Sequence, residues 1–184
     1  MMMGNHDSRA PFREVFPGTP AIDGGFVQFS FDIDGLRVIC LDSLHDEPGE
    51  HQGVLCNTRL KWLQDQLLAA PADMKIVVAV HHPPFDIGLP NMDDIRLKDD
   101  EALWEVFQTR KPDMMLHGHV HRPICGTWRG IPFHIQRGFN HQVSLEFGRC
   151  STLQYCEAYP DVTFVRHEGD SILAHTRSIG GEGE

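Results

Sequence analysis

The sequence has no pair of cysteines at a spacing that would suit a metal knuckle or a redox site. Its five cysteines are odd in number and widely scattered, at positions 40, 56, 125, 150 and 156. A pair separated by two residues is typical of zinc ribbons and thioredoxin-like proteins, so neither class is indicated. A disulfide framework is also disfavoured, and a reducing compartment fits such cysteines better. We therefore expect a cytoplasmic protein.

A basic leader, a long apolar run and an excess of positive charge are missing as well. The first residues have neither the charged segment nor the apolar core of a signal peptide. No apolar run approaches the roughly 20 residues of a membrane span. The formal net charge is −10, and a negative protein repels nucleic acid. We expect neither a membrane nor a nucleic acid as a partner.

Histidine is what the sequence has in abundance, with twelve in 184 residues. Two short apolar runs each end at histidines. Residues 75–80 lead to His81 and His82, and residues 113–116 lead to the segment 117–121, which reads His-Gly-His-Val-His. Fully apolar runs of this length are typical of strands buried in a parallel sheet. Polar residues at the ends of such strands are how open α/β sheets build sites.

The remaining pattern predicts one α/β (α+β) domain over residues 1–178, followed by a disordered tail at 179–184. Asn57 and Thr58 can cap the first expected helix. The expected elements are a hairpin over 24–42, helices over 57–69 and 99–110, a loop over 83–98, and strands joined by turns over 131–176.

The spacing of His119 and His121 suits ligands of one metal ion or of two adjacent ions. We expect Gly118 to let the backbone bend, so that both rings converge. The other isolated histidines carry no such spacing and are expected to be structural or on the surface; these are His45, His51, His134, His167 and His175.

A third cluster, Gly4-Asn5-His6-Asp7, lies near the start of the sequence. Asn5 offers an amide oxygen, and His6 offers an imidazole whose proton Asp7 can accept. The alternative is a capped turn with no role in a site. Three histidines and an amide oxygen would suit zinc, iron, manganese or nickel.

The order of these clusters resembles the calcineurin-like metallophosphoesterase superfamily, and within it the class III cyclic-nucleotide phosphodiesterases of the CpdA type. Leu41-Asp42-Ser43 and Asn140-His141-Gln142 add to the resemblance, which covers residues 4–147. It implies a four-layer α/β/β/α sandwich, of which this chain would be the C-terminal part.

The resemblance also implies a cofactor of two divalent metal ions, iron, manganese, zinc or similar, about 3.5–4 Å apart. The ions would activate a hydroxide for in-line attack on phosphorus. Asn5, His81 and His119 would bind the second ion, and His121 would bind the first.

The resemblance assigns the substrate site to residues around these ligands. His6, held by Asp7, would contact the phosphate and help to protonate the leaving oxygen. His82, Asn140 and His141 would line the site. The substrate would be a small phosphodiester, with 3',5'-cyclic AMP first, and with glycerophosphodiesters or other small diesters as the alternative.

Two motifs of the family, D-x-H and G-D-x-x-D, do not occur in this sequence. The bridging aspartate and two further ligands of the first ion are therefore missing, and we expect the chain to be inactive alone. The strands at 75–80 and 113–116 would lack neighbours and expose apolar edges. Alternatives are a non-catalytic metal-binding remnant and a single-zinc hydrolase.

The loop at 83–98 is too long for a plain connection, and long loops in compact domains are often functional. Met92 and Ile95 can offer an apolar surface to a base, and Asn91 can hydrogen-bond its edge. The alternative is that this loop makes a contact in a homodimer.

Overall fold

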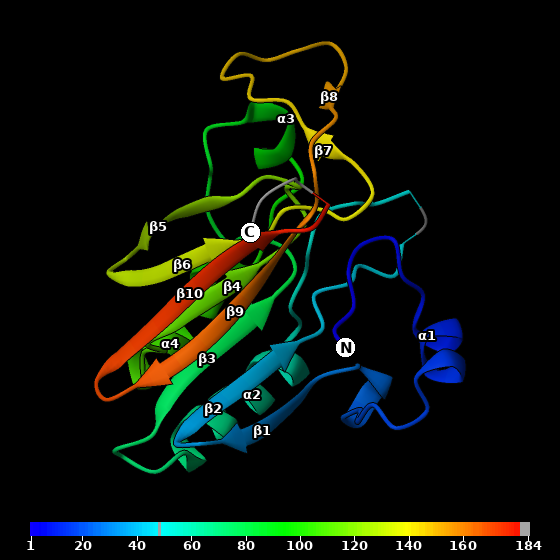
Figure 1. Cartoon of the computed structure of the whole chain (residues 1–184). Helices are drawn as coiled ribbons and strands as arrows, with labels where there is room; N and C mark the ends of the chain where they lie inside the picture. The colour runs from blue at the N-terminus through cyan, green and yellow to red at the C-terminus, as the bar shows by residue number, and fades with distance from the viewer. Residues whose placement is uncertain (48, 181–184) are drawn as a thin grey trace.

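The main sheet has six strands in the order β1-β2-β3-β4-β6-β5 (Figure 1). It is seen in a computed structural model that describes residues 1–47 and 49–180. Strands β2, β3, β4 and β6 are parallel, whereas β1 and β5 are antiparallel at the two edges. The predicted strands at 75–80 and 113–116 are confirmed. The bounds are β1 Phe29–Ile33, β2 Leu36–Leu41, β3 Lys75–Val80, β4 Met114–His117, β5 Ile124–Trp128 and β6 Ile131–Ile135.

Two helices, α2 (Asn57–Ala69) and α4 (Asp100–Thr109), cover one face of this sheet (Figure 1). Both were predicted, but the predicted cap is wrong: the residue before α2 is Cys56, and no side chain caps the helix. The shorter helices are α1 (Arg9–Val15), the 3₁₀ helix Asp23–Gly25 and α3 (Pro90–Asp93). Within the described ranges, no helix has the length and apolar character needed to cross a membrane.

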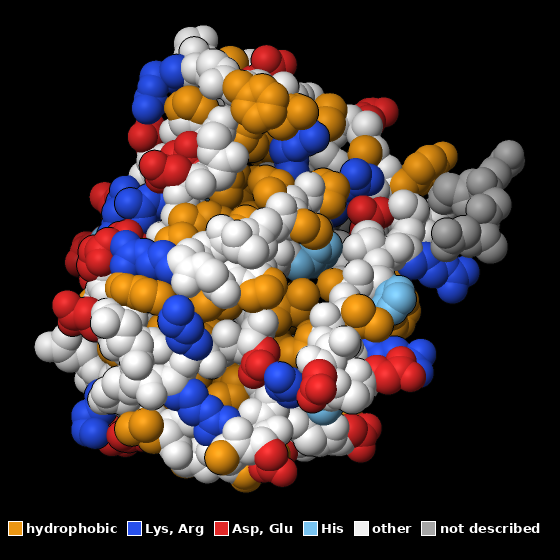
Figure 2. All heavy atoms as spheres, turned by 90° about the vertical axis from the view of Figure 1, so that its left-hand side faces the viewer, with side chains coloured by type: hydrophobic (Ala, Val, Ile, Leu, Met, Phe, Trp, Pro, Cys, Tyr) orange, Lys and Arg blue, Asp and Glu red, His pale blue; other side chains and the backbone are white. Residues whose placement is uncertain are grey.

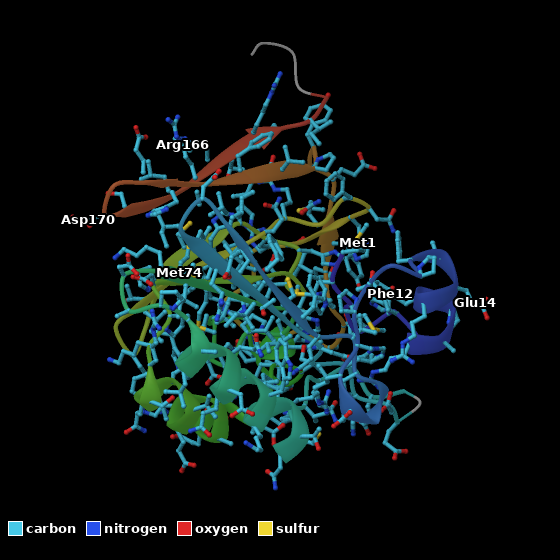
Figure 3. The ribbon with its side chains drawn as sticks, turned by 90° about the horizontal axis from the view of Figure 1, so that it is seen from below. Met1, Phe12, Glu14, Met74, Arg166 and Asp170 are labelled. Carbon is cyan, nitrogen blue, oxygen red and sulfur yellow. The ribbon has the colours of Figure 1, made fainter. Side chains whose placement is uncertain are left out.

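A hairpin of β9 (Asp161–Glu168) and β10 (Ser171–Ser178) covers the opposite face. Ile172 and Ala174 pack there against Leu36 and Val77 of the sheet. Viewed from below, helices, sheet and hairpin form three successive layers, with Arg166 and Asp170 in the outermost (Figure 3). The turn between these two strands lies in the 131–176 region, where strands joined by turns were expected. A further small pair joins β7 (Gln142–Val143) to β8 (Tyr155–Cys156).

The predicted exposure of the β3 and β4 edges is wrong. Strand β3 pairs with β2 and β4, and β4 pairs with β3 and β6, so both edges of both strands are hydrogen-bonded. The two edges of the sheet are formed instead by β1 and β5, and at the β1 edge Phe31 is 47% and Ile33 is 54% exposed. On the face drawn in Figure 2, hydrophobic side chains lie interspersed with acidic and basic ones.

The predicted disordered tail, residues 179–184, lies mostly outside the described residues. At its start, the N–H of Ile179 donates to the carbonyl of Pro160 at 2.7 Å. The domain limits therefore stay a prediction.

Candidate metal centre

Three histidines meet where β3 and β4 end. The two strands are parallel neighbours, so their carboxyl ends lie at the same edge of the sheet. The N–H of Gly118 donates to the carbonyl of His81 at 3.1 Å and joins the two strand ends. One ring nitrogen from each of His81, His82 and His119 lies within 4.8 Å of the others.

Asn5 reaches this cluster from a distant part of the chain. Its side-chain oxygen accepts a hydrogen bond from Nε2 of His81 at 3.0 Å. The turn that presents Asn5 is closed by the N–H of Asp7, which donates to the carbonyl of Gly4, and by the N–H of Gly4, which donates to the Asp7 carboxylate at 2.7 Å. The carboxylate is thus engaged by Gly4 and not by His6. The predicted pairing of Asp7 with His6 is wrong, and the capped turn is what forms.

A buried ion pair anchors the N-terminal segment beside the site. Nε and Nη2 of Arg9 donate to the two carboxylate oxygens of Asp42 at 2.7 and 2.8 Å. The same carboxylate accepts the N–H groups of Val27 and Leu44 at 2.8 and 3.0 Å, and it is fully buried. Charge-assisted bidentate pairs of this kind are strong and directional. Asp42 therefore fixes the segment that carries Asn5 and is itself fully bonded.

Three glycines leave room for the rings of the site. A Cβ at Gly4 would lie 2.8 Å from Cε1 of His81, and one at Gly118 would lie 3.1 Å from its Nδ1. A Cβ at Gly138 would lie 2.7 Å from Nδ1 of His121. The backbone approaches the histidines more closely than a side chain would allow.

The backbone bends after β4 at His119 and His121 themselves. His119 has φ +65° and His121 has φ +53°, whereas Gly118 is not in the left-handed region. The prediction that Gly118 supplies the bend is therefore wrong; its role is to make space. Left-handed backbone at residues other than glycine is uncommon and clusters at functional sites.

His119 has the environment of a metal ligand. Its side chain is buried, and within the described residues neither of its ring nitrogens has a hydrogen-bond partner. Buried polar atoms are almost always bonded, so such a group calls for an explanation. Burial lowers the pKa of His119 to about 4 and also lowers the pKa of His81 well below its usual value. Neutral imidazole is the form that binds metals.

His121 is oriented as metal-binding histidines commonly are. Its Nδ1–H donates to the carbonyl of His141 at 3.0 Å, which leaves the lone pair on Nε2. A hydrogen bond from the nitrogen that faces away from the metal fixes the tautomer and the ring direction. Burial lowers the pKa of His121.

His82 lies next to His81 and His119, and both of its ring nitrogens are hydrogen-bonded. Its Nε2–H donates to the carbonyl of His51 at 3.1 Å, so its Nδ1 accepts from the hydroxyl of Ser43 at 2.8 Å. The ring is fully buried, and burial lowers its pKa to about 3. The predicted contact of His82 with substrate is wrong, because its ring is buried and packs against the rings of His81 and His119.

A pocket of about 170 Å³ opens in front of the cluster. His141 lies on its wall as predicted, whereas Asn140 is exposed and is not among the residues that line it. His51, which has no distinctive spacing in the sequence, also lines the pocket, with its ring 5.8 Å from that of His6. The lining residues are Asn5, His6, His51, Met92, Ile95, His119, His121, His141, Val143, Leu153 and Tyr155.

The segment at 83–98 contributes to this wall and includes the short helix α3. Met92 and Ile95 line the pocket. The side chain of Asn91 instead donates to the carbonyl of Cys150 at 3.0 Å and accepts from its N–H at 3.2 Å. The predicted contact of Asn91 with a base is therefore wrong: both ends of its amide fasten this segment to the β7–β8 segment.

Comparison with known proteins agrees with this geometry. The profile of the calcineurin-like phosphoesterase family matches residues 1–123. The chain belongs to this family. A probable cyclic nucleotide phosphodiesterase of Rhodopseudomonas palustris is 46% identical over 180 residues, which are 97% of this chain and 66% of that protein. A cAMP/cGMP dual specificity phosphodiesterase of Mycobacterium tuberculosis is 36% identical over 135 residues, 71% of this chain and 40% of that protein.

The fold is that of a dimetal phosphatase. A crystal structure of a dimetal phosphatase from Danio rerio matches with a TM-score of 0.60 at 17% identity, over 74% of this chain and 60% of that one. The likeness confirms the predicted fold class. Membership of the calcineurin-like phosphoesterase family, together with the histidine cluster, implies divalent metal ions. Asn5, His81, His119 and His121 fit the role of ligands in donor type and placement. The chain spans slightly less than two thirds of the Rhodopseudomonas relative and less than half of the Mycobacterium relative.

Proposed function

We propose that this chain supplies part of a two-metal phosphodiesterase centre whose substrate is a 3',5'-cyclic nucleotide. The observation that carries the proposal is His119, buried with both ring nitrogens unpartnered in the described part of the chain, next to the hydrogen-bonded pair of Asn5 and His81. The relatives named cyclic nucleotide phosphodiesterases support the substrate class.

Asn5, His81 and His119 would hold one divalent ion, and His121 would help to hold the other. When bound, such ions polarise the phosphoryl group and activate water at neutral pH. Their positive charge also offsets the net charge of −10 and permits an anionic substrate. The carboxylate ligands of a two-metal site would come from residues that carry the D-x-H and G-D-x-x-D motifs, which this sequence lacks.

His6 is the group of this chain that we assign to proton transfer. It lines the pocket, its side chain is exposed, and the capped turn at Gly4–Asp7 holds it beside Asn5. A proton from its ring would go to the oxygen that leaves phosphorus. His51 lines the same pocket, with its ring 5.8 Å from that of His6, and would contact the same phosphate.

A second candidate substrate is a glycerophosphodiester. A probable glycerophosphodiester phosphodiesterase of Arcobacter nitrofigilis is 29% identical over 181 residues, 96% of this chain and 65% of that protein. The apolar residues that line the pocket favour the nucleotide, because a glycerol group would leave them in contact with water.

The function is tested by comparing residues 1–184 with a fusion to a segment that carries the two motifs. With manganese or zinc, the short chain should hydrolyse cyclic AMP and bis-p-nitrophenyl phosphate poorly, and the fusion should hydrolyse both. Full activity of the short chain, or an inactive fusion that folds and binds metal, would contradict the proposal.

Two variants of the active fusion separate the assigned roles. His6→Ala should lower turnover by about 10²–10⁴-fold, as for loss of a general acid, with metal content unchanged. His119→Ala should lose metal, which elemental analysis of the dialysed protein would measure. Equal metal content in the two variants would show that this division of roles is wrong.

A further inference from the structure

One tyrosine on the wall of the pocket has no place in the metal site. Tyr155 lies in β8, opposite Val143 of β7, and both line the pocket. The edge of its ring meets the ring of His141, with centroids 4.8 Å apart and planes at 87°. The ring of His141 in turn lies 4.3 Å from that of His121. Tyr155 is thus two ring contacts away from a candidate metal ligand.

The residues that line the pocket are of two chemical kinds. Asn5 and the histidines are polar, whereas the rest are apolar or aromatic, namely Met92, Ile95, Val143, Leu153 and Tyr155. Tyr155 remains 59% exposed although it borders the pocket. A cavity with a few convergent polar groups and an apolar, aromatic wall suits a ligand that is polar at one end and apolar at the other.

We infer that Tyr155 is a specificity-determining residue, whose ring packs against the base of a nucleotide while the histidines take the phosphate. The inference rests on the proposed function and names the part of the substrate that the β7–β8 segment selects. Stacking on an aromatic side chain tolerates any base, since every base has a π-face. Tyr155 therefore selects an aromatic substituent over an aliphatic one and does not distinguish adenine from guanine.

The composition of the chain permits a direct test, because it contains only two tyrosines, Tyr155 and Tyr159. Tyr159 is 60% exposed and is not among the residues that line the pocket, so it is a matched reference. Residues 1–184 with ring-labelled tyrosine would be loaded with zinc and titrated by NMR. The ligands are cyclic AMP and trimethylene cyclic phosphate, which has the same six-membered phosphodiester ring without sugar or base.

Cyclic AMP should shift the ring signals of Tyr155 and leave those of Tyr159 in place, and trimethylene cyclic phosphate should shift neither. Tyr155→Ala should weaken the binding of cyclic AMP about 5- to 100-fold and leave that of the base-free phosphate unchanged. Tyr155→Phe keeps the ring and should bind both as the unaltered chain does, as should Tyr159→Ala.

The outcomes separate the inference from the function on which it rests. If both ligands bind but Tyr155→Ala weakens them equally or not at all, the role of Tyr155 is overturned and the phosphodiester site stands. If neither ligand binds the zinc-loaded chain or the fusion that carries the two motifs, the proposed function and this inference are both overturned.

Discussion

Gly138 marks a position where the site depends on the absence of a side chain. A Cβ there would lie 2.7 Å from Nδ1 of His121 and 2.7 Å from the carbonyl oxygen of His141, which accepts the bond from that nitrogen. Gly138→Ala should therefore turn the ring and lower zinc affinity about 10- to 100-fold, as loss of the hydrogen bond that orients a metal-binding histidine does. Gly148→Ala is the control, because a Cβ at that position meets nothing within 4 Å. Calorimetric titration with zinc would measure both, and equal affinities would contradict this role.

His117 should make the stability of the metal-free protein depend on pH. It is buried, and burial lowers its pKa to about 4, against about 6.5 in an unfolded chain. Between these values the unfolded chain binds a proton that the folded chain excludes. The contribution of His117 to the free energy of unfolding is thus fully present above about pH 6.5. It falls as the pH drops towards 4, by up to about 1.4 kcal/mol per pH unit.

The measurement is urea unfolding between pH 4.5 and 7 with a chelator present. His117→Leu removes the titrating ring, so its unfolding free energy should fall less steeply with pH than that of the unaltered chain. The variant also loses the hydrogen bond to the carbonyl of Val80, which lowers its stability at every pH without changing the slope. Parallel curves for the two proteins would rule out this contribution of His117.

The candidate ligand residues could be predicted because they follow apolar strands or stand in a recognisable motif. His81 and His119 follow β3 and β4. Asn5 belongs to the cluster Gly4-Asn5-His6-Asp7, which contributes to the family resemblance. His51 and Tyr155 were not predictable, since neither has a distinctive spacing. They reach the pocket through contacts between segments that are separated along the chain, such as the hydrogen bond from His82 to the carbonyl of His51.

At the scale of elements, Asp42 ties the N-terminal segment to the end of β2. Asp42→Asn would remove the charge that Arg9 faces in a buried setting, where the Arg9 side chain is only 13% exposed. Breaking one partner of such a pair costs about 3–5 kcal/mol, and we expect that loss in urea unfolding. Asp46 also pairs with Arg9 but is 69% exposed. Asp46→Asn is therefore the matched control and should change stability little; equal losses would refute the role of Asp42.

Which elements form was easier to predict than how they pair. The runs that form β3 and β4 are apolar on both faces, so they were evident from composition. Strand β5 was missed because its sequence, Ile-Cys-Gly-Thr-Trp, has no simple alternation, and Gly126 leaves room for the ring of Phe133 across the pair. The prediction that β3 and β4 expose their edges was wrong because the hairpin of β1 and β2, which is distant along the chain, supplies the neighbour of β3.

At the scale of the whole molecule, the three layers bring residues from both ends of the matched region to one edge of the sheet. Asn5 and His119 lie more than a hundred positions apart in the sequence, and both border the same pocket. The acidic net charge of the chain disfavours polyanions but is compatible with a small diester at a metal centre. We therefore expect these residues, taken together, to bind a divalent metal.

Zinc binding by residues 1–184 can be measured by calorimetry and by X-ray absorption. We predict a bound ion with nitrogen and oxygen ligands at about 2.0–2.2 Å, including histidine. His119→Ala should abolish tight binding, whereas His175→Ala, in an exposed position of β10, should not change it. Zinc affinity that is equal in the unaltered chain and in His119→Ala would show that His119 is not a ligand and that the histidine cluster is not the metal site.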